Sequence, residues 1–376
     1  MSKKIYEETP IYGKLSIISM RGCEEMTAHI DKYLKSFRSF EDYDTYSIPV
    51  TCPRFATGEG KCSIAQTVRG HDVYIICDMF NYGVTYKMYG HDNHMSPDDH
   101  FQDLKRIIGA CGGKARRITV IMPMLYEGRQ HKRSGRESLD CAIALSELVQ
   151  MGVSNIITFD AHDPRIQNAI PLSGFDNVQA TYQMIKAITQ TVPDIKLNKE
   201  KTIIISPDEG GMSRCMYYSS VLGLDLGMFY KRRNYAVVVD GKNPIEAHEY
   251  LGHDVSGKDV IIIDDMISSG DSLLDVAGKL KAQGAERIFA FVTFGLFTSG
   301  LECFDKAYEN GVISKIFTTN LVYRNPELAD KEWYCEVDMS KYISIMINTL
   351  NHDDTISSLL DPIDKIRNYL KKTEAN

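Results

Sequence analysis

Short apolar runs alternate along the chain with segments in which apolar residues recur every three or four positions. The runs are typical of buried strands, and the spaced segments are typical of helices with one face on a core. Strands are predicted at residues 15–19, 73–77, 118–122, 155–159, 202–206, 226–230, 260–264, 288–293 and 316–319. Helices are predicted at residues 24–35, 97–110, 138–151 and 273–283, and directly after Gly210–Gly211.

This alternation predicts βαβ units and a doubly wound α/β fold. The runs at 202–206 and 260–264 lack polar alternation, as expected of parallel strands buried on both faces. The length of 376 residues predicts two domains at roughly 150 residues each. We place the domains at residues 1–170 and 171–350, followed by a helical tail at 351–376 that is divided near Pro362. Residues 82–95 lack periodicity and predict a surface loop, inserted into the first domain.

Composition excludes several classes of protein. Apolar residues make up 43% of the chain and charged residues 25%, which excludes extensive disorder. The net charge of −7 argues against a protein that coats nucleic acid. No apolar run approaches the roughly 18 residues that span a membrane, and MSKKIYEETP lacks the apolar core of a signal peptide. Nine cysteines without CxxC pairs indicate reduced thiols, so we expect a cytoplasmic protein.

The segment DVIIIDDMISSGDSLLDVAGKL carries the strongest chemistry. A buried strand delivers Asp264 and Asp265 to its carboxyl end, where open α/β sheets bind ligands. The turn that follows supplies small and hydroxyl-bearing residues at Ser268, Ser269, Gly270 and Ser272. The helix start binds phosphate, and paired carboxylates accept hydrogen bonds from vicinal sugar hydroxyls. The segment therefore predicts a sugar-phosphate site; the alternative is a capped strand–helix turn with surface aspartates.

This segment resembles the ribose-5-phosphate loop of type I phosphoribosyltransferases and of ribose-phosphate diphosphokinases. Five further segments, in the same order along the chain, resemble the diphosphokinases alone: RFATGEGKCSI, GRQHKRSGRES, FDAHDPRIQNAIP, ISPDEGGMSR and FYKRRN. The chain is therefore identified as a divergent member of the ribose-phosphate diphosphokinase family. The resemblance implies two phosphoribosyltransferase-like domains, each with a largely parallel sheet flanked by helices.

The resemblance also implies roles for individual residues. ATP would be held by Phe55, Glu59, Arg129 and Gln130. Mg²⁺ would be bound by His162 and Asp208. The catalytic cations would be Lys231 and Arg233. Independently of the resemblance, the three cations at residues 231–233, directly after a buried strand, suit a loop that closes over polyphosphate.

The implied reaction converts ATP and ribose 5-phosphate to AMP and 5-phosphoribosyl 1-diphosphate. The sugar 1-hydroxyl attacks the β-phosphorus of ATP, and the β,γ-diphosphoryl group is transferred. Members of this family work as homo-oligomers, built from dimers and often hexameric, so we expect a homo-oligomer here. No nucleic-acid or membrane partner is expected.

Four positions depart from the family pattern. Thr57 replaces an Asp in the adenine segment, His131 replaces the Asp of the ARQD run, Ser268 stands where Asp is frequent, and Asp271 where Gly is frequent. These changes keep open a non-catalytic regulatory homologue. A phosphoribosyltransferase that consumes the diphosphate product is the other alternative. His91 and His94 have no nearby cysteine, and closed zinc sites need four ligands, so we predict no zinc there.

Overall fold

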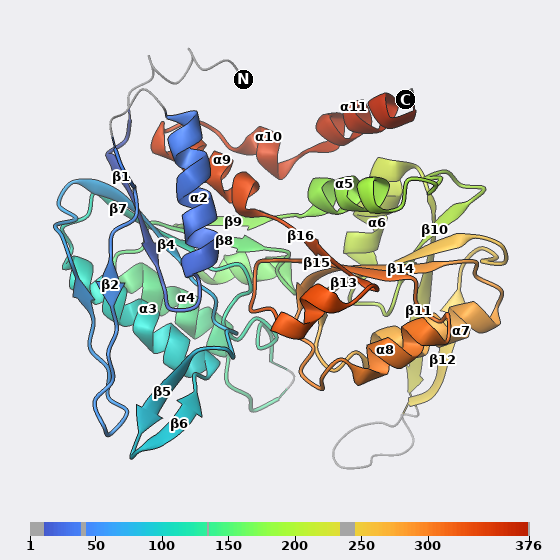
Figure 1. Ribbon diagram of the computed structural model, residues 1–376, viewed down its shortest axis with the longest axis horizontal. Coiled ribbons are helices and arrows are strands. Elements are labelled where there is room, and N and C mark those ends of the chain that lie inside the picture. The colour runs from blue at the N-terminus through green and yellow to red at the C-terminus, as the bar shows by residue number, and fades with distance from the viewer. Residues whose placement is uncertain (1–10, 39–42, 134, 234–244, 375–376) are drawn as a thin grey trace. The chain divides into compact units, whose positions relative to one another are not determined.

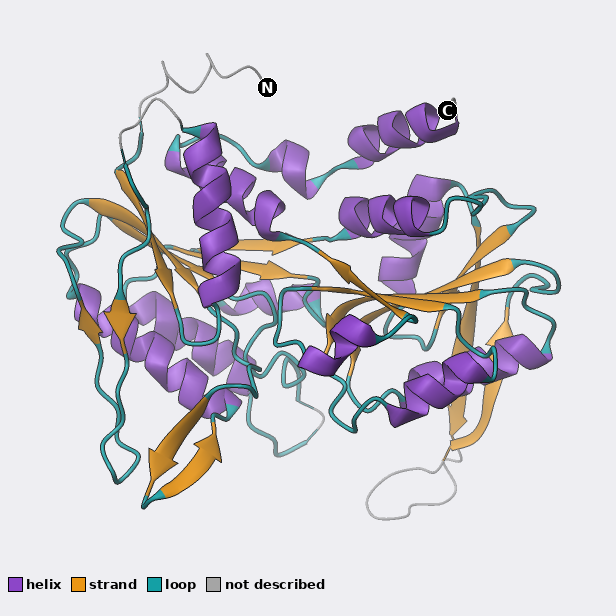
Figure 2. Ribbon diagram, in the orientation of Figure 1, coloured by secondary structure: helices purple, strands orange, loops and turns teal. Residues whose placement is uncertain are grey.

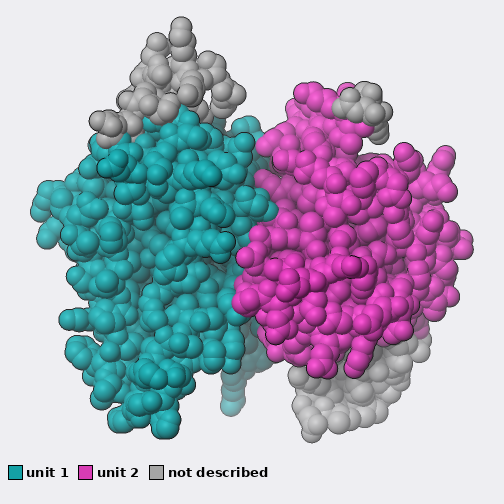
Figure 3. Space-filling model, in the orientation of Figure 1, with its two compact units in different colours: residues 1–180, 320–323, 338–361 teal, residues 181–319, 324–337, 362–376 magenta. Residues whose placement is uncertain are grey.

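The computed structural model describes residues 11–38, 43–133, 135–233 and 245–374. These residues form two compact units, which Figure 3 distinguishes by colour. Unit 1 comprises Met1–Ala180, Asn320–Tyr323 and Asp338–Asp361, and unit 2 comprises Thr181–Thr319, Arg324–Val337 and Pro362–Asn376. These boundaries differ from those predicted. Residues 338–350 belong to unit 1 and not to the C-terminal domain, and the tail is divided between the units at Pro362.

Unit 1 contains a five-stranded parallel sheet with two short hairpins beside it (Figures 1 and 2). The strands of the sheet, in spatial order, are β1 (Lys14–Ser19), β4 (His71–Ile76), β7 (Arg117–Ile121), β8 (Asn155–Phe159) and β9 (Gly174–Val178). The hairpins are β2 (Val50–Thr51) with β3 (Ser63–Ile64), and β5 (Thr85–Met88) with β6 (His91–His94). The helices are α2 (Glu24–Phe37), α3 (Pro97–Cys111), α4 (Asp140–Gln150), α9 (Ser340–Asn351) and α10 (Ser357–Leu360), with the 3₁₀ helix η1 (Pro164–Ala169).

The outer edge of this sheet makes the first unit doubly wound. Residues 46–48 lie beside β1 in parallel. The Ile17 N–H donates to the Tyr46 carbonyl at 2.9 Å, and the Ile48 N–H donates to the Ile17 carbonyl at 2.8 Å. The chain thus goes outward from β1 and then returns to β4 on the other side of β1. Helices α2 and α9 lie on one face of the sheet, and α3 and α4 on the other (Figure 1).

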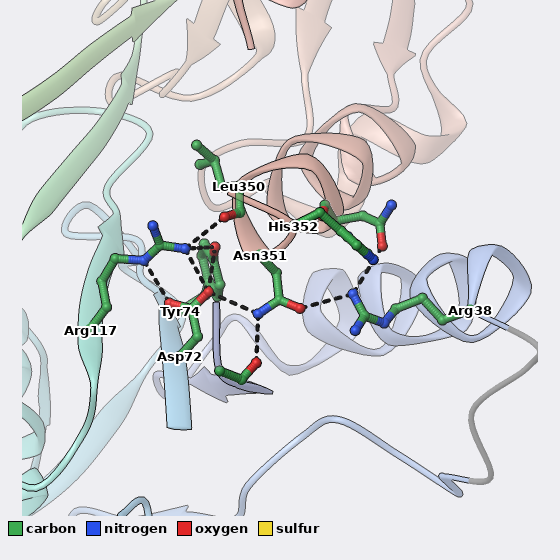
Figure 4. A network of polar contacts seen from close by, with 9 residues as sticks. Arg38, Asp72, Tyr74, Arg117, Leu350, Asn351 and His352 are labelled. Atoms are coloured by element: carbon green, nitrogen blue, oxygen red, sulfur yellow. Dashed lines mark hydrogen bonds and ion pairs between the residues drawn. The ribbon is translucent and has the colours of Figure 1, made fainter. Parts of the chain in front are cut away.

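Helix α9 is fastened to unit 1 by a buried polar network (Figure 4). The Asn351 side chain donates to Asp72 at 3.0 Å and accepts from Arg38 at 2.9 Å. Arg117 makes two 2.7 Å bonds to the Asp72 carboxylate and also donates to the carbonyl of Leu350. Because α9 also packs against α2, these late residues complete the first unit.

Residues 82–95, predicted to be a loop, instead contain the hairpin β5–β6. Its tip, Tyr89–Gly90, has φ angles of 49° and 82°, the positive values that a type I′ turn requires. Tyr82 stacks on His94 with 4.0 Å between ring centroids, and His94 Nδ1 lies 2.7 Å from the Tyr82 carbonyl oxygen. The prediction was wrong because an exposed hairpin has little apolar alternation, and Tyr-Gly is not a usual I′ pair.

Unit 2 contains a seven-stranded sheet in which every neighbouring pair is parallel except β11–β12. In spatial order the strands are β12 (Ile245–Leu251), β11 (Asp225–Arg233), β10 (Thr202–Ser206), β13 (Asp259–Ile267), β14 (Ile288–Gly295), β15 (Lys315–Thr319) and β16 (Tyr334–Val337). The helices are α5 (Thr181–Thr191), α6 (Met212–Leu222), α7 (Asp271–Ala282), α8 (Glu302–Glu309) and α11 (Ile363–Glu374), with the 3₁₀ helix η2 (Pro326–Asp330). In Figure 1, α5 and α6 lie on one face of this sheet, and α7 and α8 on the other.

The core between α7, α8 and this sheet is built on aromatic stacking. Trp333 is buried and stacks on Phe304 with 5.4 Å between centroids, and its indole N–H donates to Asp305 at 2.7 Å. Leu273 and Val276 of α7 belong to the same apolar cluster. This packing fixes the start of α7 relative to the sheet. Within the described residues, the structure contains no helix long and apolar enough to cross a bilayer.

Candidate active site

The sheet of unit 2 brings two of the sequence motifs to one edge. The strand order changes side at β10, since the next strand, β11, lies on one side of it and the later strand β13 lies on the other. Open α/β sheets bind ligands at such a switch point, outside the carboxyl ends of the strands. Gly211 lies between the two motifs, since a Cβ there would be 2.8 Å from Ser206 Oγ and 3.6 Å from the Ile263 oxygen. The SPDEGG loop and the DD segment therefore lie side by side.

The carboxylate pair lies within β13 and not beyond it, because the strand extends to Ile267 and was predicted to end at Asp264. Asp264 is half-buried, and Asp265 is 5% exposed. Burial and the neighbouring Asp265 raise the pKa of Asp264 well above its usual value, while Arg214 of α6, 3.9 Å away, opposes this shift. Asp264 also accepts a 2.9 Å bond from the Asp265 backbone N–H. The Asp264 carboxyl therefore loses its proton less readily than a free aspartate, and Arg214 partly offsets this effect.

The loop before α7 is a tight turn that depends on a glycine and is rich in hydroxyl side chains. Gly270 has φ +95°, and a Cβ there would lie 2.2 Å from the Phe304 ring, so only glycine fits. Ser269 Oγ donates to Asp271 Oδ2 at 2.9 Å. This bond turns the carboxylate of Asp271, which stands where the family often has Gly, back toward its own loop. Ser268 is joined to the next loop, because its carbonyl accepts from the Thr298 N–H at 2.9 Å. Ser272 is exposed in the first turn of the helix, whose N–H groups favour an anion.

The second loop at this edge is organised by Asp208. Its Oδ1 accepts from the N–H groups of Gly210 at 2.9 Å and Gly211 at 3.3 Å. Ser206 Oγ donates to the Asp208 carbonyl at 2.7 Å. The carboxylate therefore has a fixed orientation at the start of α6. Lys231 and Arg233 end β11 on the other side of β10, and their side chains lie outside the described residues.

In unit 1, the predicted adenine segment forms a tight turn. The Phe55 N–H donates to the Glu59 carbonyl at 2.7 Å, and the Phe55 side chain is 53% exposed. Thr57 Oγ1 donates to Glu59 Oε2 at 3.0 Å. Thr57, which replaces the family's Asp, therefore orients the Glu59 carboxylate. Buried Arg54 anchors the turn through its ion pair with Asp103. The turn thus presents an exposed ring next to an oriented carboxylate.

The hairpin β5–β6 supports this turn from one side. The Tyr89 N–H donates to the Ala56 carbonyl at 2.8 Å, and a Cβ on Gly58 would lie 2.8 Å from Met88 Sδ. The Arg54 guanidinium lies 5.2 Å from the centroid of the Tyr86 ring. The inserted residues 82–95 therefore pack against the turn and support it.

The loops after β7 and β8 are linked by His131, the residue that replaces the Asp of the ARQD run. Its Nε2 lies 3.3 Å from Asp163 Oδ2, and its ring centroid is 5.4 Å from that of His162. Arg165 holds Asp163 from the other side, which lowers the pKa of Asp163 to about 2. Arg129 and Gln130 precede His131 in the same loop, which is closed by a 2.8 Å bond from the Gln130 N–H to the Glu127 carbonyl. Within unit 1 the structure thus brings the segments GRQHKRSGRES and FDAHDPRIQNAIP together.

Sequence reasoning missed three residues at these edges. Arg214 faces Asp264, and Thr298 contacts Ser268, with no signal in the sequence that pairs them. Asp78 lies beyond β4, at the switch point between β1 and β4. Asp78 could have been predicted from the sequence, because it follows an apolar strand as Asp264 does.

Asp78 predicts a dependence of stability on pH. Burial raises the pKa of this carboxyl to about 7, although it accepts bonds from Phe80 and Tyr323 N–H groups at 2.9 and 2.6 Å. A raised folded-state pKa gives stability that is present below the unfolded value near 4 and lost as pH rises toward 7, by about 4 kcal/mol. We expect Asp78→Asn to abolish this component of the pH slope in chemical denaturation between pH 5 and 8. An unchanged slope would contradict the assignment.

The fold and the carboxylate–hydroxyl loop define the phosphoribosyltransferase class of protein. Residues 174–312 match the family model of the phosphoribosyl transferase domain, and residues 15–152 match that of the N-terminal domain of ribose phosphate pyrophosphokinase. The chain belongs to the ribose-phosphate pyrophosphokinase family, which is the family identified above under its synonym diphosphokinase.

Similar proteins cover most of the chain. The ribose-phosphate pyrophosphokinase of Vibrio cholerae is 28% identical over 317 residues, covering 83% of this chain and 90% of that protein. That of Parasynechococcus marenigrum is 29% identical, covering 73% of this chain and 75% of the relative. The crystal structure of phosphoribosylpyrophosphate synthetase from Mycobacterium smegmatis has a TM-score of 0.73 at 20% identity, covering 90% of this chain and 99% of that one. This last likeness concerns the fold.

Proposed function

We propose that this protein transfers the β,γ-diphosphoryl group of ATP to the 1-hydroxyl of ribose 5-phosphate, giving 5-phosphoribosyl 1-diphosphate and AMP. A bond forms between the sugar O1 and the β-phosphorus, the bond from the β-phosphorus to the bridging oxygen of AMP breaks, and the hydroxyl proton is released. The observation that carries the proposal is the match of both halves of the chain, in order, to the two domains of this family.

Ribose 5-phosphate would bind at the switch-point edge of unit 2. The N–H groups and hydroxyls of Ser268, Ser269, Gly270 and Ser272 would surround its phosphate. Asp264 and Asp265 would accept hydrogen bonds from the sugar hydroxyls, and Arg214 favours the ionised form of Asp264 that does so best. This orients the 1-hydroxyl for attack, and phosphoryl transfer depends mainly on such positioning.

ATP would be recognised by the turn and loops of unit 1. The exposed Phe55 ring offers a face for the base, and Thr57 orients Glu59 toward it. Arg129 and Gln130 would hold the polyphosphate. The resemblance to the family implies that Lys231 and Arg233 stabilise the charge that develops on the transferring group.

Magnesium is the metal that the donor atoms fit. Within the described part of the chain, no group of three or more His, Cys, Asp or Glu side chains could hold a metal ion. Mg²⁺ needs no such cage, since it keeps several waters and binds one or two carboxylates together with substrate phosphates. Asp208, a hard oxygen donor of fixed orientation, fits this role in unit 2. The resemblance to the family implies that His162 is also a magnesium ligand. When bound, Mg²⁺ neutralises phosphate charge.

We also propose that the protein acts in the cytoplasm as a homo-oligomer built from dimers. The large exposed ring of Tyr89, 75% accessible, supports a contact between copies beside the nucleotide turn.

The first test is release of AMP from ATP and Mg²⁺ with and without ribose 5-phosphate, followed by phosphorus NMR of the product. We expect AMP only when the sugar is present, together with a new diphosphate ester. A folded sample that binds ribose 5-phosphate but forms no AMP from any nucleoside triphosphate would contradict the proposal and favour the regulatory homologue.

Thr57 provides a test of the nucleotide turn. Thr57→Val removes the 3.0 Å bond that orients Glu59, which is worth about 1.5–3 kcal/mol because the acceptor is charged. We expect KM for ATP to rise about tenfold, with KM for ribose 5-phosphate unchanged, in steady-state kinetics. Thr57→Ser keeps the hydroxyl and serves as the matched control. Equal kinetics for the Val and Ser variants would show that this bond plays no part.

A further inference from the structure

Cys52 and Cys62 face each other at the neck of the nucleotide turn, residues 53–61. Three neighbouring antiparallel pairs share one register: Val50 with Ile64, Thr51 with Ser63, and Arg54 with Gly60. The same register pairs Cys52 with Cys62. Phe55 and Glu59, which we assign to ATP, lie on the turn that this pair closes.

The cysteine pair occupies a position without mutual backbone hydrogen bonds. The bonds across the ladder run from Ala65 to Pro49, from Lys61 to Pro53 and from Phe55 to Glu59, at 3.0, 3.2 and 2.7 Å. These odd-numbered pairs alternate with the pair 52–62. Non-hydrogen-bonded partners have Cα atoms about 4.5 Å apart, which lies within the range of about 4.4–6.8 Å that disulfides span.

The two thiols are also suited to exchange chemistry. Interaction between the two thiols lowers the pKa of Cys52 and raises that of Cys62. Arg54 and Arg106 add to the lowering at Cys52. Cys52 is buried, whereas Cys62 is half-exposed. The pair therefore combines Cys52, which forms a thiolate more readily, with Cys62, which is the more accessible thiol.

We propose that Cys52 and Cys62 form a reversible disulfide that controls ATP binding by the nucleotide turn. The oxidant is a small-molecule disulfide of the glutathione type. Cys52, whose thiolate Cys62, Arg54 and Arg106 favour, attacks the external disulfide and releases one small thiolate. Cys62 then loses its proton to the released thiolate and attacks the Cys52 sulfur, which releases the second small thiolate. Two thiols become one disulfide, and the external disulfide is reduced to two thiols.

The effect on ATP, which rests on the proposed function, follows from the geometry of the neck. Disulfides favour a Cα separation of about 5.5–6 Å, so the bond spreads the two strands by about 1 Å. The adjoining bond from Lys61 to Pro53, already 3.2 Å long, yields first. Phe55 and Glu59 then move relative to the sheet of unit 1. A displacement of this size in a positioning element weakens binding of ATP.

The test treats the full-length protein with glutathione disulfide, blocks the remaining thiols by alkylation, and maps cross-linked peptides by mass spectrometry. We expect a Cys52–Cys62 peptide and a rise of about fivefold in KM for ATP, with KM for ribose 5-phosphate unchanged. Dithiothreitol should reverse both. Cys52→Ser and Cys62→Ser should lose the cross-link and keep the reduced KM, while Cys303→Ser, at a half-exposed cysteine of unit 2, should respond like the native protein.

Three results would overturn the proposal. One is the absence of a cross-link, and another is a disulfide from Cys62 to Cys111, whose thiol is near enough to affect the pKa of Cys62. The third is a cross-linked protein whose KM for ATP equals that of the reduced form. Because the peptide map needs no activity, failure of the proposed function is distinguished from failure of the disulfide.

Discussion

Replacing Asp264 by asparagine is expected to raise the KM for ribose 5-phosphate about a hundredfold at pH 8, because charge-assisted bonds to the sugar hydroxyls are worth about 1.5–3 kcal/mol each. KM for ATP should change less than twofold. Asp264 is the half-exposed member of the pair, so it is the carboxylate that a sugar reaches from the edge of the sheet. Initial-rate kinetics with each substrate varied in turn measures both constants.

The raised pKa of Asp264 gives this prediction a second readout. The ionised form binds the sugar best, so kcat/KM for ribose 5-phosphate should rise with pH in the native protein. The asparagine variant should lose that rise because its amide does not titrate. Asp275→Asn is the matched control, since Asp275 lies on the neighbouring helix α7 in an ion pair with Lys279. A defect directed mainly at ATP would contradict the sugar-site assignment.

Gly270→Ala is expected to destabilise unit 2 by about 2–5 kcal/mol. A left-handed conformation costs an L-residue about 1–2 kcal/mol, and overpacking adds about 1–3 kcal/mol. Both apply here, since φ is +95° and the new Cβ would lie 2.2 Å from the Phe304 ring. The loop must also move, so KM for ribose 5-phosphate should rise. Denaturant midpoints and initial rates measure the two effects.

A second glycine, within helix α7 itself, provides the control for this variant. A Cβ on Gly278 would meet no heavy atom within 4 Å, so Gly278→Ala should instead stabilise the protein by about 0.5–1 kcal/mol. Adding Phe304→Leu to Gly270→Ala should recover part of the loss by making room. If the two alanine variants were equally stable, neither the backbone strain nor the contact with Phe304 would be important.

Elements with strong local patterns could be predicted from the sequence, and those that depend on distant partners could not. The TIIIS run of β10 is buried throughout, and its predicted bounds agree with those observed. Helix α9 was not predicted, because burial around nearly its whole circumference removes the polar face that marks a helix. The strand β9, with the polar sequence GFDNV, forms only because β8 offers an edge for it.

The same distinction holds for the site. The DD segment was recognised because it follows a continuous apolar strand, and the SPDEGG loop was recognised by its resemblance to the family. The structure places the two side by side in unit 2. The pairing of His131 with Asp163 joins loops 32 residues apart in the sequence, and nothing local announces it. The register of Cys52 with Cys62 likewise needs the strand pairing. The roles of Lys231 and Arg233 stay predictions, because their side chains lie outside the described residues.

The late completion of unit 1 has a consequence for synthesis on the ribosome. Chains usually fold domain by domain, with the N-terminal domain first. Here α2 packs against α9, and Asp72 and Arg38 are hydrogen-bonded to Asn351. These contacts cannot form until α9 has been translated, so the first unit is completed only after most of the chain has been synthesised. The side of α2 that packs against α9 stays uncovered for that interval. The strands of the second sheet, which all precede α9 in the chain, can therefore pair before the first unit is finished.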